Sequence, residues 1–339
     1  MNQAVTGQRP TGLSAQSAVT VVRGGAALGA EIQGVDLRER LSEVDFQVIH
    51  DALVEHEVLV FRDQDVSQAQ QAEFAGRFGK LTVHPFAASL KDRPEMIVLD
   101  NDEENPPNST DQWHSDEMFQ LEPPMGTCLR MRVKPAHGGD TLFASMTAAY
   151  EGLSASMRRF LDELESENDF KVFRKVFSRS IERRRQLVDI EEMFPTPVHP
   201  VVRVHPVTGK RLVYVSPQTT TRIRGMREWE SDRVLDMLYH LPEIPEYQYR
   251  VQWELHTIVI WDNRSTQHYA PRDYLPNRRR VERVTIKGDR PVGVNGLASV
   301  FARDKPEFEP RGDRTRIKSD EFARPFEAML AARRAGSRD

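Results

Sequence analysis

The stretch WHSDEMFQLEPP, residues 113–124, sets a histidine two positions before an aspartate, behind a tryptophan and ahead of a double proline. Side chains of extended backbone alternate between two faces, so His114 and Asp116 can point the same way and bind neighbouring positions of one metal ion. Alone, a His-x-Asp pair is a weak signal, because a loop histidine hydrogen-bonded to its neighbour has the same sequence. The metal interpretation therefore depends on a third ligand elsewhere in the chain.

A candidate third ligand lies in VIWDNRSTQHYA, residues 259–270. His268 follows an apolar strand that ends at Trp261, where a strand delivers a side chain to the rim of a sheet. Taken alone, His268 is equally typical of a semi-buried, hydrogen-bonded histidine. Two histidines and one carboxylate, however, are the ligands that hold non-haem Fe(II) while leaving three positions open. The sequence therefore predicts His114, Asp116 and His268 as metal-binding and catalytic residues.

An arginine cluster, NRRRVERVTI at residues 277–286, follows the turn APRDYLP. That turn folds the next strand back beside His268, which brings Arg279 toward the predicted metal. A guanidinium there can grip a carboxylate with two parallel hydrogen bonds. Arg278 and Arg280 alternate with Arg279 and are interpreted as solvated surface charges.

The composition of the 339 residues excludes several classes of protein. With 39% hydrophobic and 29% charged residues, the chain reads as globular and soluble, long enough for one large or two ordinary domains. The net charge of −4 gives no basic surface for nucleic acid. The single cysteine, Cys128, is interpreted as a buried core residue and excludes an intrachain disulfide, which fits a reducing cytoplasm. Neither a membrane span nor a signal peptide is indicated, and residues 1–17 read as a flexible polar leader.

Periodicity predicts many short strands with a few helices and no regular strand–helix alternation. The expected fold class is mainly β with flanking helices, an antiparallel sandwich. The basic stretch 173–186 is interpreted as a mobile excursion, because the global charge argues against a nucleic-acid patch. The predicted helices are 42–54, 67–78, 154–167, 231–241 and a short one near 319–334. The predicted strands lie within 18–37, 57–63, 95–100, 125–133, 140–144, a hairpin at 198–216, 247–255, 257–263 and 279–288.

Three separated blocks resemble the taurine dioxygenase/TfdA family of Fe(II)- and 2-oxoglutarate-dependent dioxygenases. They are WHSDEMFQLEPP, GGDTLFASMTAAYEGLS and WDNRSTQHYAPRDYLPNRRRVERVTIKGDRP. The similarity runs from about residue 18 to 291. It implies a double-stranded β-helix, or jelly roll, as a single domain over 18–294, with a charged extension at 295–339. It also implies Fe(II), 2-oxoglutarate and O2 as cofactor and cosubstrates, and it is compatible with a homo-oligomer.

The resemblance also implies residue roles. His114, Asp116 and His268 match the iron ligands. Arg279 matches the arginine that pairs with the far carboxylate of 2-oxoglutarate, and Thr141, in GGDTL, matches the hydroxyl that assists it.

The substrate side of the site differs in part from the family pattern. Arg283 and His84 match residues that hold the anionic group of taurine. Ala87 and Thr219 stand where the taurine enzyme has aromatic rings, and a polar pocket residue matches either Ser109 or Thr110. Losing two rings widens the pocket and removes apolar contacts to a small substrate. The resemblance therefore points to a small anionic organic substrate that is still larger than taurine.

The expected reaction is oxidation of an unactivated C–H bond, by default hydroxylation, with release of succinate and CO2. A carboxylated natural-product intermediate is the favoured substrate, and sulfonates, alkyl sulfates and aryloxyalkanoates are alternatives within the family. Asp116 argues against halogenation, whereas desaturation and ring rearrangement stay open. Two other classes also stay open: a zinc hydrolase using the same three ligands, and a jelly-roll binding protein without catalysis.

Overall fold

The computed structural model describes residues 17–85, 89–107, 110–170 and 192–305. All of them belong to one compact unit that extends to Lys305; a second unit, 306–339, lies outside the described residues. The predicted leader (apart from residue 17), the basic stretch 173–186 and the helix near 319–334 also fall outside them.

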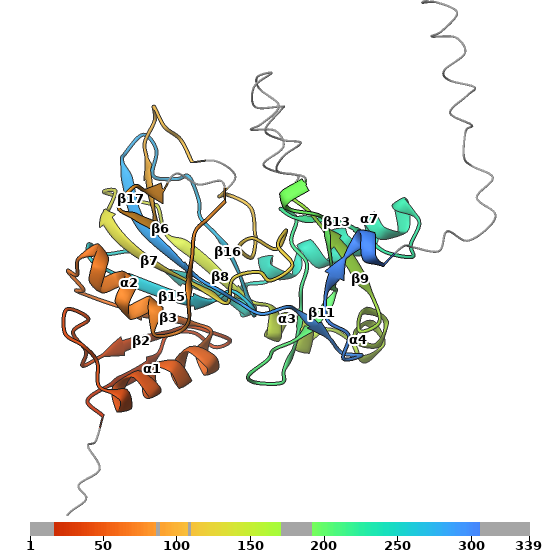
Figure 1. Cartoon of the computed structure of the whole chain (residues 1–339), viewed down its shortest axis with the longest axis horizontal. Helices are drawn as coiled ribbons and strands as arrows, with labels where there is room; N and C mark the ends of the chain where they lie inside the picture. The colour runs from red at the N-terminus through yellow and green to blue at the C-terminus, as the bar shows by residue number, and fades with distance from the viewer. Residues whose placement is uncertain (1–16, 86–88, 108–109, 171–191, 306–339) are drawn as a thin grey trace, which may run out of the picture. The chain divides into compact units, whose positions relative to one another are not determined.

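Two N-terminal helices begin where their capping residues predict. The hydroxyl of Ser42 accepts from the Asp45 N–H and starts α1 (Glu43–His56). Ser67 forms a reciprocal capping box with Gln70 and starts α2 (Gln68–Gly76). Their apolar faces pack on the large sheet in one buried cluster. In Figure 1, α1 lies along β2, β3 and β15, and α2 lies nearer β7 and β17.

Within the described part of the chain, the large sheet holds nine strands, and β17 lies between β7 and β6. β3 and β15 are buried along their whole lengths because helices cover one face and a second sheet covers the other. In spatial order the strands are β1 (Thr20–Arg23), β2 (Ala30–Gln33), β3 (Val58–Phe61), β15 (Ile258–Asp262), β7 (Gly126–Val133), β17 (Arg279–Ile286), β6 (Arg93–Asn101) and β5 (Ser89–Leu90), with β4 (Leu81–Thr82) paired to β17.

The second sheet has the order β14 (Gln248–Val251), β8 (Thr141–Ser145), β16 (Thr266–Tyr269). A buried cluster that includes Phe143, Val259 and Trp261 joins side chains of this sheet to those of the large one. These two sheets, antiparallel except for the parallel pair β2–β3, face each other across such a layer and form the predicted jelly roll, so the predicted fold class is confirmed.

The remaining elements of the described chain include α3, α7 and the hairpin β11–β12, whose side chains form a further apolar cluster. The hairpin predicted at 198–216 is confirmed by the antiparallel pairing of β11 with β12. These elements are α3 (Met146–Gly152), α4 (Ala155–Leu161), β9 (Glu165–Asn168), β10 (Pro197–Pro200), β11 (Val202–Val204), β12 (Arg211–Val213), β13 (Thr220–Ile223), α7 (Glu228–Tyr239), β18 (Val292–Gly293), β19 (Val300–Phe301) and the short 3-10 turns η1 (Leu241–Glu243), η2 (Pro245–Tyr247) and η3 (Ala302–Asp304).

The helix predicted over 154–167 was too long. It begins at Ser154 as expected but ends at Leu161, and Glu165–Asn168 is a strand. This segment pairs with β10 on one side and β13 on the other, and Ser166 and Asn168 are buried. Pairing with two distant strands overrides the local helical pattern. Farther along the chain, β19 pairs with β10, so the compact unit continues beyond residue 295.

Cys128 is fully buried in the apolar cluster beneath α1 and α2, as predicted. Burial raises the pKa of its thiol to about 12, which keeps it protonated and unreactive. Among the described residues, no helix is both long enough and apolar enough to cross a membrane.

Glu57 is a buried carboxyl group that makes stability depend on pH. It ends α1 in the left-handed region, with φ of 62°, and its backbone carbonyl accepts from the N–H of Asp262. Burial, and the nearby charge of Asp262, raise its pKa to about 8. A carboxyl group whose pKa is raised by folding adds fully to the free energy of unfolding at pH values below its pKa in the unfolded chain, near 4.5. That contribution is lost as the pH rises through its folded-state pKa of about 8.

We therefore expect Glu57→Gln to flatten the fall in unfolding free energy between pH 5 and 8.5. The difference should be on the order of a few kcal/mol, because each pKa unit corresponds to about 1.4 kcal/mol. Urea denaturation at the two pH values measures it. Glu55→Gln, at a side chain that is 75% exposed, is the matched control and should leave the slope unchanged. Equal slopes in Glu57→Gln and the wild type would show that Glu57 is not the titrating group.

Candidate active site

His114, Asp116 and His268 converge, although they come from segments far apart in the sequence. The segment holding His114 runs beside the end of β16, where His114 and His268 exchange two backbone hydrogen bonds of 3.1 and 2.8 Å. The Asp116 Oδ1 atom lies 4.0 Å from His114 Nε2 and 3.9 Å from His268 Nε2. One ligand atom from each of the three buried residues falls within 4.8 Å of the others. These separations are those of atoms that can share one metal ion.

The protonation of the three groups suits a divalent cation. His114 Nδ1 lies 2.7 Å from the Gln112 carbonyl and so carries the hydrogen, which leaves the Nε2 lone pair facing Asp116. Burial lowers the pKa of both imidazoles, that of His268 to about 3. Burial alone would raise the pKa of Asp116, but Arg283 and the two histidines hold it below its ordinary value. The site thus offers two neutral imidazoles and one carboxylate.

The other oxygen of Asp116 is already engaged. Oδ2 accepts a 2.8 Å hydrogen bond from the Thr127 hydroxyl and lies 3.0 Å from Nη2 of Arg283. The Arg283 contact is an ion pair without good hydrogen-bond alignment. These two contacts fix the rotation of the carboxylate, so that Oδ1 faces the histidines.

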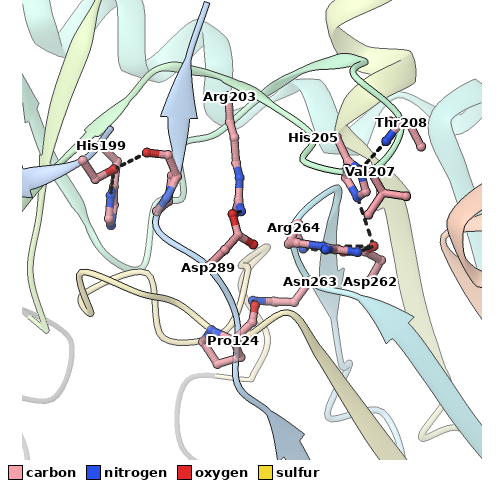
Figure 2. Close-up of polar contacts among 12 residues, drawn as sticks. Pro124, His199, Arg203, His205, Val207, Thr208, Asp262, Asn263, Arg264 and Asp289 are labelled. Atoms are coloured by element: carbon pink, nitrogen blue, oxygen red, sulfur yellow. Dashed lines mark hydrogen bonds and ion pairs between the residues drawn. The ribbon is translucent and has the colours of Figure 1, made fainter. Parts of the chain in front are cut away.

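Asn263, directly after β15, holds the backbone of Asp116. Its side-chain oxygen accepts from the Asp116 N–H at 2.7 Å, and its amide nitrogen donates to the carbonyls of Asp116 and Pro124 at 3.1 Å each. Figure 2 shows Asn263 extending to Pro124 beside the ion pair of Asp262 with Arg264. The segment after β15 therefore fixes the backbone position of one candidate metal ligand, 147 residues away in the sequence.

We expect Asn263→Ala to weaken metal binding by roughly 10- to 100-fold, the usual cost of removing a group that orients a ligand. Equilibrium titration with Fe(II) under anaerobic conditions measures this. The matched control is Gln64→Ala, which removes another buried amide that bridges loop backbone, at the Leu37 N–H and the Arg62 carbonyl. Both variants should lose stability, but only Asn263→Ala should lose metal affinity; equal affinities would assign Asn263 a purely structural role.

Two of the three candidate ligands, His114 and His268, line a cavity between the two sheets. Thr141, Arg279 and Arg283, which also have predicted roles, line it with them. On β17, positions 279, 281 and 283 all face this cavity, as strand alternation predicts. The flanking Arg278 and Arg280 instead pair with Asp100 at the surface, which confirms their interpretation as surface charges.

Arg279 is a buried cation with an unused donor. Its Nε donates to the Gly139 carbonyl at 2.9 Å, while its buried Nη2 has no hydrogen-bond partner in the described part of the chain. Burial lowers its pKa to about 10, which leaves it charged at neutral pH. The Thr141 hydroxyl accepts from the indole N–H of Trp253 at 3.0 Å, so its own proton remains available to a ligand. An unpaired buried guanidinium beside a free hydroxyl proton fits a carboxylate.

The remaining predicted pocket residues have different outcomes. His84 lies near the triad, with Nε2 3.7 Å from a carboxylate oxygen of Glu117. Thr110 lines the cavity. Thr219 is buried just before β13 but is not among the residues that line this cavity. Ala87 and Ser109 lie outside the described residues.

Glu117 is a site residue that sequence reasoning missed. It follows Asp116, adopts a left-handed backbone with φ of 55°, and is buried beside Arg283. Burial raises the pKa of its carboxyl group to about 7, against the opposing charge of Arg283. Asn263 and Thr127 were not predicted either. The roles of all three residues depend on side-chain contacts that their spacing along the chain does not reveal.

Comparison with known proteins agrees with this geometry. Residues 20–285 match the model of the taurine catabolism dioxygenase TauD, TfdA family. An alpha-ketoglutarate-dependent sulfate ester dioxygenase of Pseudomonas putida is 36% identical over 282 residues, 81% of this chain and 92% of that protein. An alkylsulfatase of Acinetobacter baylyi is 35% identical over 275 residues, 80% and 85% of the two chains.

A solved structure of a taurine dioxygenase from Burkholderia xenovorans superposes with a TM-score of 0.72 at 33% identity, covering 84% of this chain and 96% of that one. The family model spans most of the chain, and both relatives and the solved structure are matched over nearly their whole lengths. The chain belongs to the TauD, TfdA family of dioxygenases.

Proposed function

We propose that the protein hydroxylates an unactivated C–H bond of an anionic organic substrate larger than taurine, using Fe(II), 2-oxoglutarate and O2. The observation that carries this proposal is the convergence of His114, Asp116 and His268 beside a cavity that His114 and His268 line together with Arg279, whose Nη2 has no hydrogen-bond partner among the described residues. Three protein donors on one side leave room for a chelating cosubstrate and oxygen.

The residues fit Fe(II) in donor type, protonation and support. Two neutral imidazoles and an ionised carboxylate surround one point, and Thr127 and Asn263 hold the carboxylate residue in place. Fe(II) bound there supplies the oxidising chemistry that converts 2-oxoglutarate and O2 to succinate and CO2 and delivers one oxygen atom to the substrate. The protein contributes placement, because the target carbon must be held close to the metal.

For the cosubstrate, we assign Arg279 to the far carboxylate of 2-oxoglutarate, assisted by the Thr141 hydroxyl. Both side chains line the cavity, and each retains a donor that no described residue uses. A bidentate guanidinium–carboxylate pair fixes the orientation of the ligand as well as its affinity.

For the substrate, we assign Arg283 and His84 to the anionic group. Arg283 lines the cavity beside the triad. From the resemblance, Ala87 in place of an aromatic ring leaves space for a body larger than taurine, whereas Thr219 is not among the described residues that line this cavity. The ring missing at position 87 favours a carboxylated natural-product intermediate as the substrate. A sulfate ester is the second candidate, because a relative from Pseudomonas putida is named a sulfate ester dioxygenase.

An anaerobic titration of the Fe(II)-loaded protein with 2-oxoglutarate tests the proposal. A visible metal-to-ligand charge-transfer band should appear and saturate, and succinate should then form only when O2 is admitted. A zinc hydrolase would instead turn over without O2 and without 2-oxoglutarate. A protein that binds Fe(II) but shows neither the band nor succinate formation would refute the proposed activity.

A further inference from the structure

Three polar atoms meet beside the triad at separations too long for direct hydrogen bonds. Oε1 of Glu117 lies 3.8 Å from Nη2 of Arg283 and 3.7 Å from Nε2 of His84. All three side chains are at most 15% exposed. Hydrogen bonds between such atoms are about 2.7–3.2 Å long. The spacing leaves Oε1 of Glu117 and Nη2 of Arg283 able to contact a common ligand group instead of each other.

One oxygen of the Glu117 carboxyl group, Oε1, is buried without a hydrogen-bond partner among the described residues. The other oxygen, Oε2, accepts from the Gln120 amide, which holds the carboxyl group in place. Nε and Nη2 of Arg283 likewise have no hydrogen-bond partner in the described part of the chain. A buried polar atom without a hydrogen-bond partner costs free energy. A carboxyl oxygen and a guanidinium that lie side by side, each with atoms to which no described residue forms a hydrogen bond, therefore indicate a site for a ligand.

Charge balance argues against a purely structural role for Glu117. Arg283 is already paired with Asp116 at 3.0 Å, so its charge does not need a second carboxyl group. A carboxyl oxygen beside an arginine that binds anions also opposes a ligand group that offers only acceptors, such as a sulfonate or a sulfate. A ligand that satisfies both groups offers an acceptor to Arg283 and a hydrogen to Glu117.

We propose that Glu117 determines specificity, and that the substrate group seated at Arg283 is a carboxylate with a hydroxyl or amino group on the adjacent carbon. The carboxylate would accept from Arg283, and the adjacent O–H or N–H would donate to Oε1 of Glu117. This inference rests on the proposed function, because it concerns the substrate of the same oxidation site. It refines the general expectation of an anion into a 2-hydroxy or 2-amino acid.

The test uses matched compounds of equal chain length: a carboxylic acid, its 2-hydroxy and 2-amino derivatives, and the corresponding sulfonate. Their dissociation constants are measured by anaerobic titration of the protein loaded with Fe(II) and 2-oxoglutarate, and stimulated succinate release is measured in air. The wild type should bind at least one donor-bearing acid about tenfold or more tightly than the unsubstituted acid and the sulfonate. Glu117→Ala should remove that preference and improve binding of the sulfonate relative to the wild type.

Glu117→Gln provides a variant of the same shape in case the alanine variant does not fold, and it should shift the preference in the same direction. Glu122→Ala, in the same loop but paired with Lys287, is the matched control and should keep the wild-type preference. A wild type that prefers the sulfonate or the unsubstituted acid overturns the inference, as does a folded Glu117→Gln with unchanged preference. A normal charge-transfer band in those same samples would leave the proposed dioxygenase function standing, whereas its absence in the wild type would count against that function.

Discussion

Replacing Asp116 by alanine is expected to abolish succinate formation while leaving the protein folded. Asp116 is the only carboxylate in the cluster of potential metal ligands found among the described residues, and its Oδ1 faces both histidines at about 4 Å. Losing a residue that merely orients a ligand costs roughly 10- to 100-fold, so losing the ligand itself should cost more than about 100-fold in turnover. Anaerobic Fe(II) titration and succinate release in air measure the two effects.

The same substitution has a predictable structural effect. It leaves the Thr127 hydroxyl and the Arg283 guanidinium without their partner at Asp116, so a modest drop in melting temperature should accompany the loss of activity. Asp51→Ala, on the exposed face of α1 with a side chain 67% exposed, is the matched control and should keep wild-type metal binding. Near-wild-type turnover in a folded Asp116→Ala protein would exclude the proposed metal site.

Arg279→Ala is expected to raise the KM for 2-oxoglutarate by about 30-fold or more, with a smaller change in the affinity for the primary substrate. Removing one partner of a buried, hydrogen-bonded charge pair costs roughly 2–5 kcal/mol, and about 1.4 kcal/mol corresponds to a tenfold change. Steady-state succinate release at varied 2-oxoglutarate measures the effect, and the midpoint of the charge-transfer titration should move in parallel.

Two further variants test whether the effect of Arg279→Ala comes from the shape of the guanidinium and from this position in the strand. Arg279→Lys keeps the charge but loses the planar fork, so it should fall between the wild type and the alanine variant. Arg278→Ala removes the adjacent arginine, which is 51% exposed and paired with Asp100, and should leave the 2-oxoglutarate requirement unchanged. If the affinity for the primary substrate fell instead, the assigned roles of Arg279 and Arg283 would be reversed.

Much of the local structure could be predicted from the sequence, because it depends on interactions between residues that are close together along the chain. Ser42 and Ser67 predicted where their helices begin, because a hydroxyl that caps a helix accepts a hydrogen bond from an N–H only three residues away. The apolar run Ile258–Trp261 of β15 reflects a strand covered on both faces. The shared face of His114 and Asp116 was predicted from the alternation of side chains in extended backbone. His268 and Arg279 were predicted from the strand and the turn that precede them, and resemblance to a known family assigned their roles.

Only the tertiary structure decided the parts that depend on distant partners. Glu165–Asn168 is a strand, not a helical turn, because β10 and β13 supply its hydrogen bonds. Asn263 supports Asp116 from 147 residues away, and Glu117 meets Arg283 only once β17 has folded against β7. By itself the sequence determined which side chains could bind metal and carboxylate. The packing of the two sheets decided which of them share one cavity, because backbone pairing and apolar burial bring together residues whose spacing along the chain carries no such information.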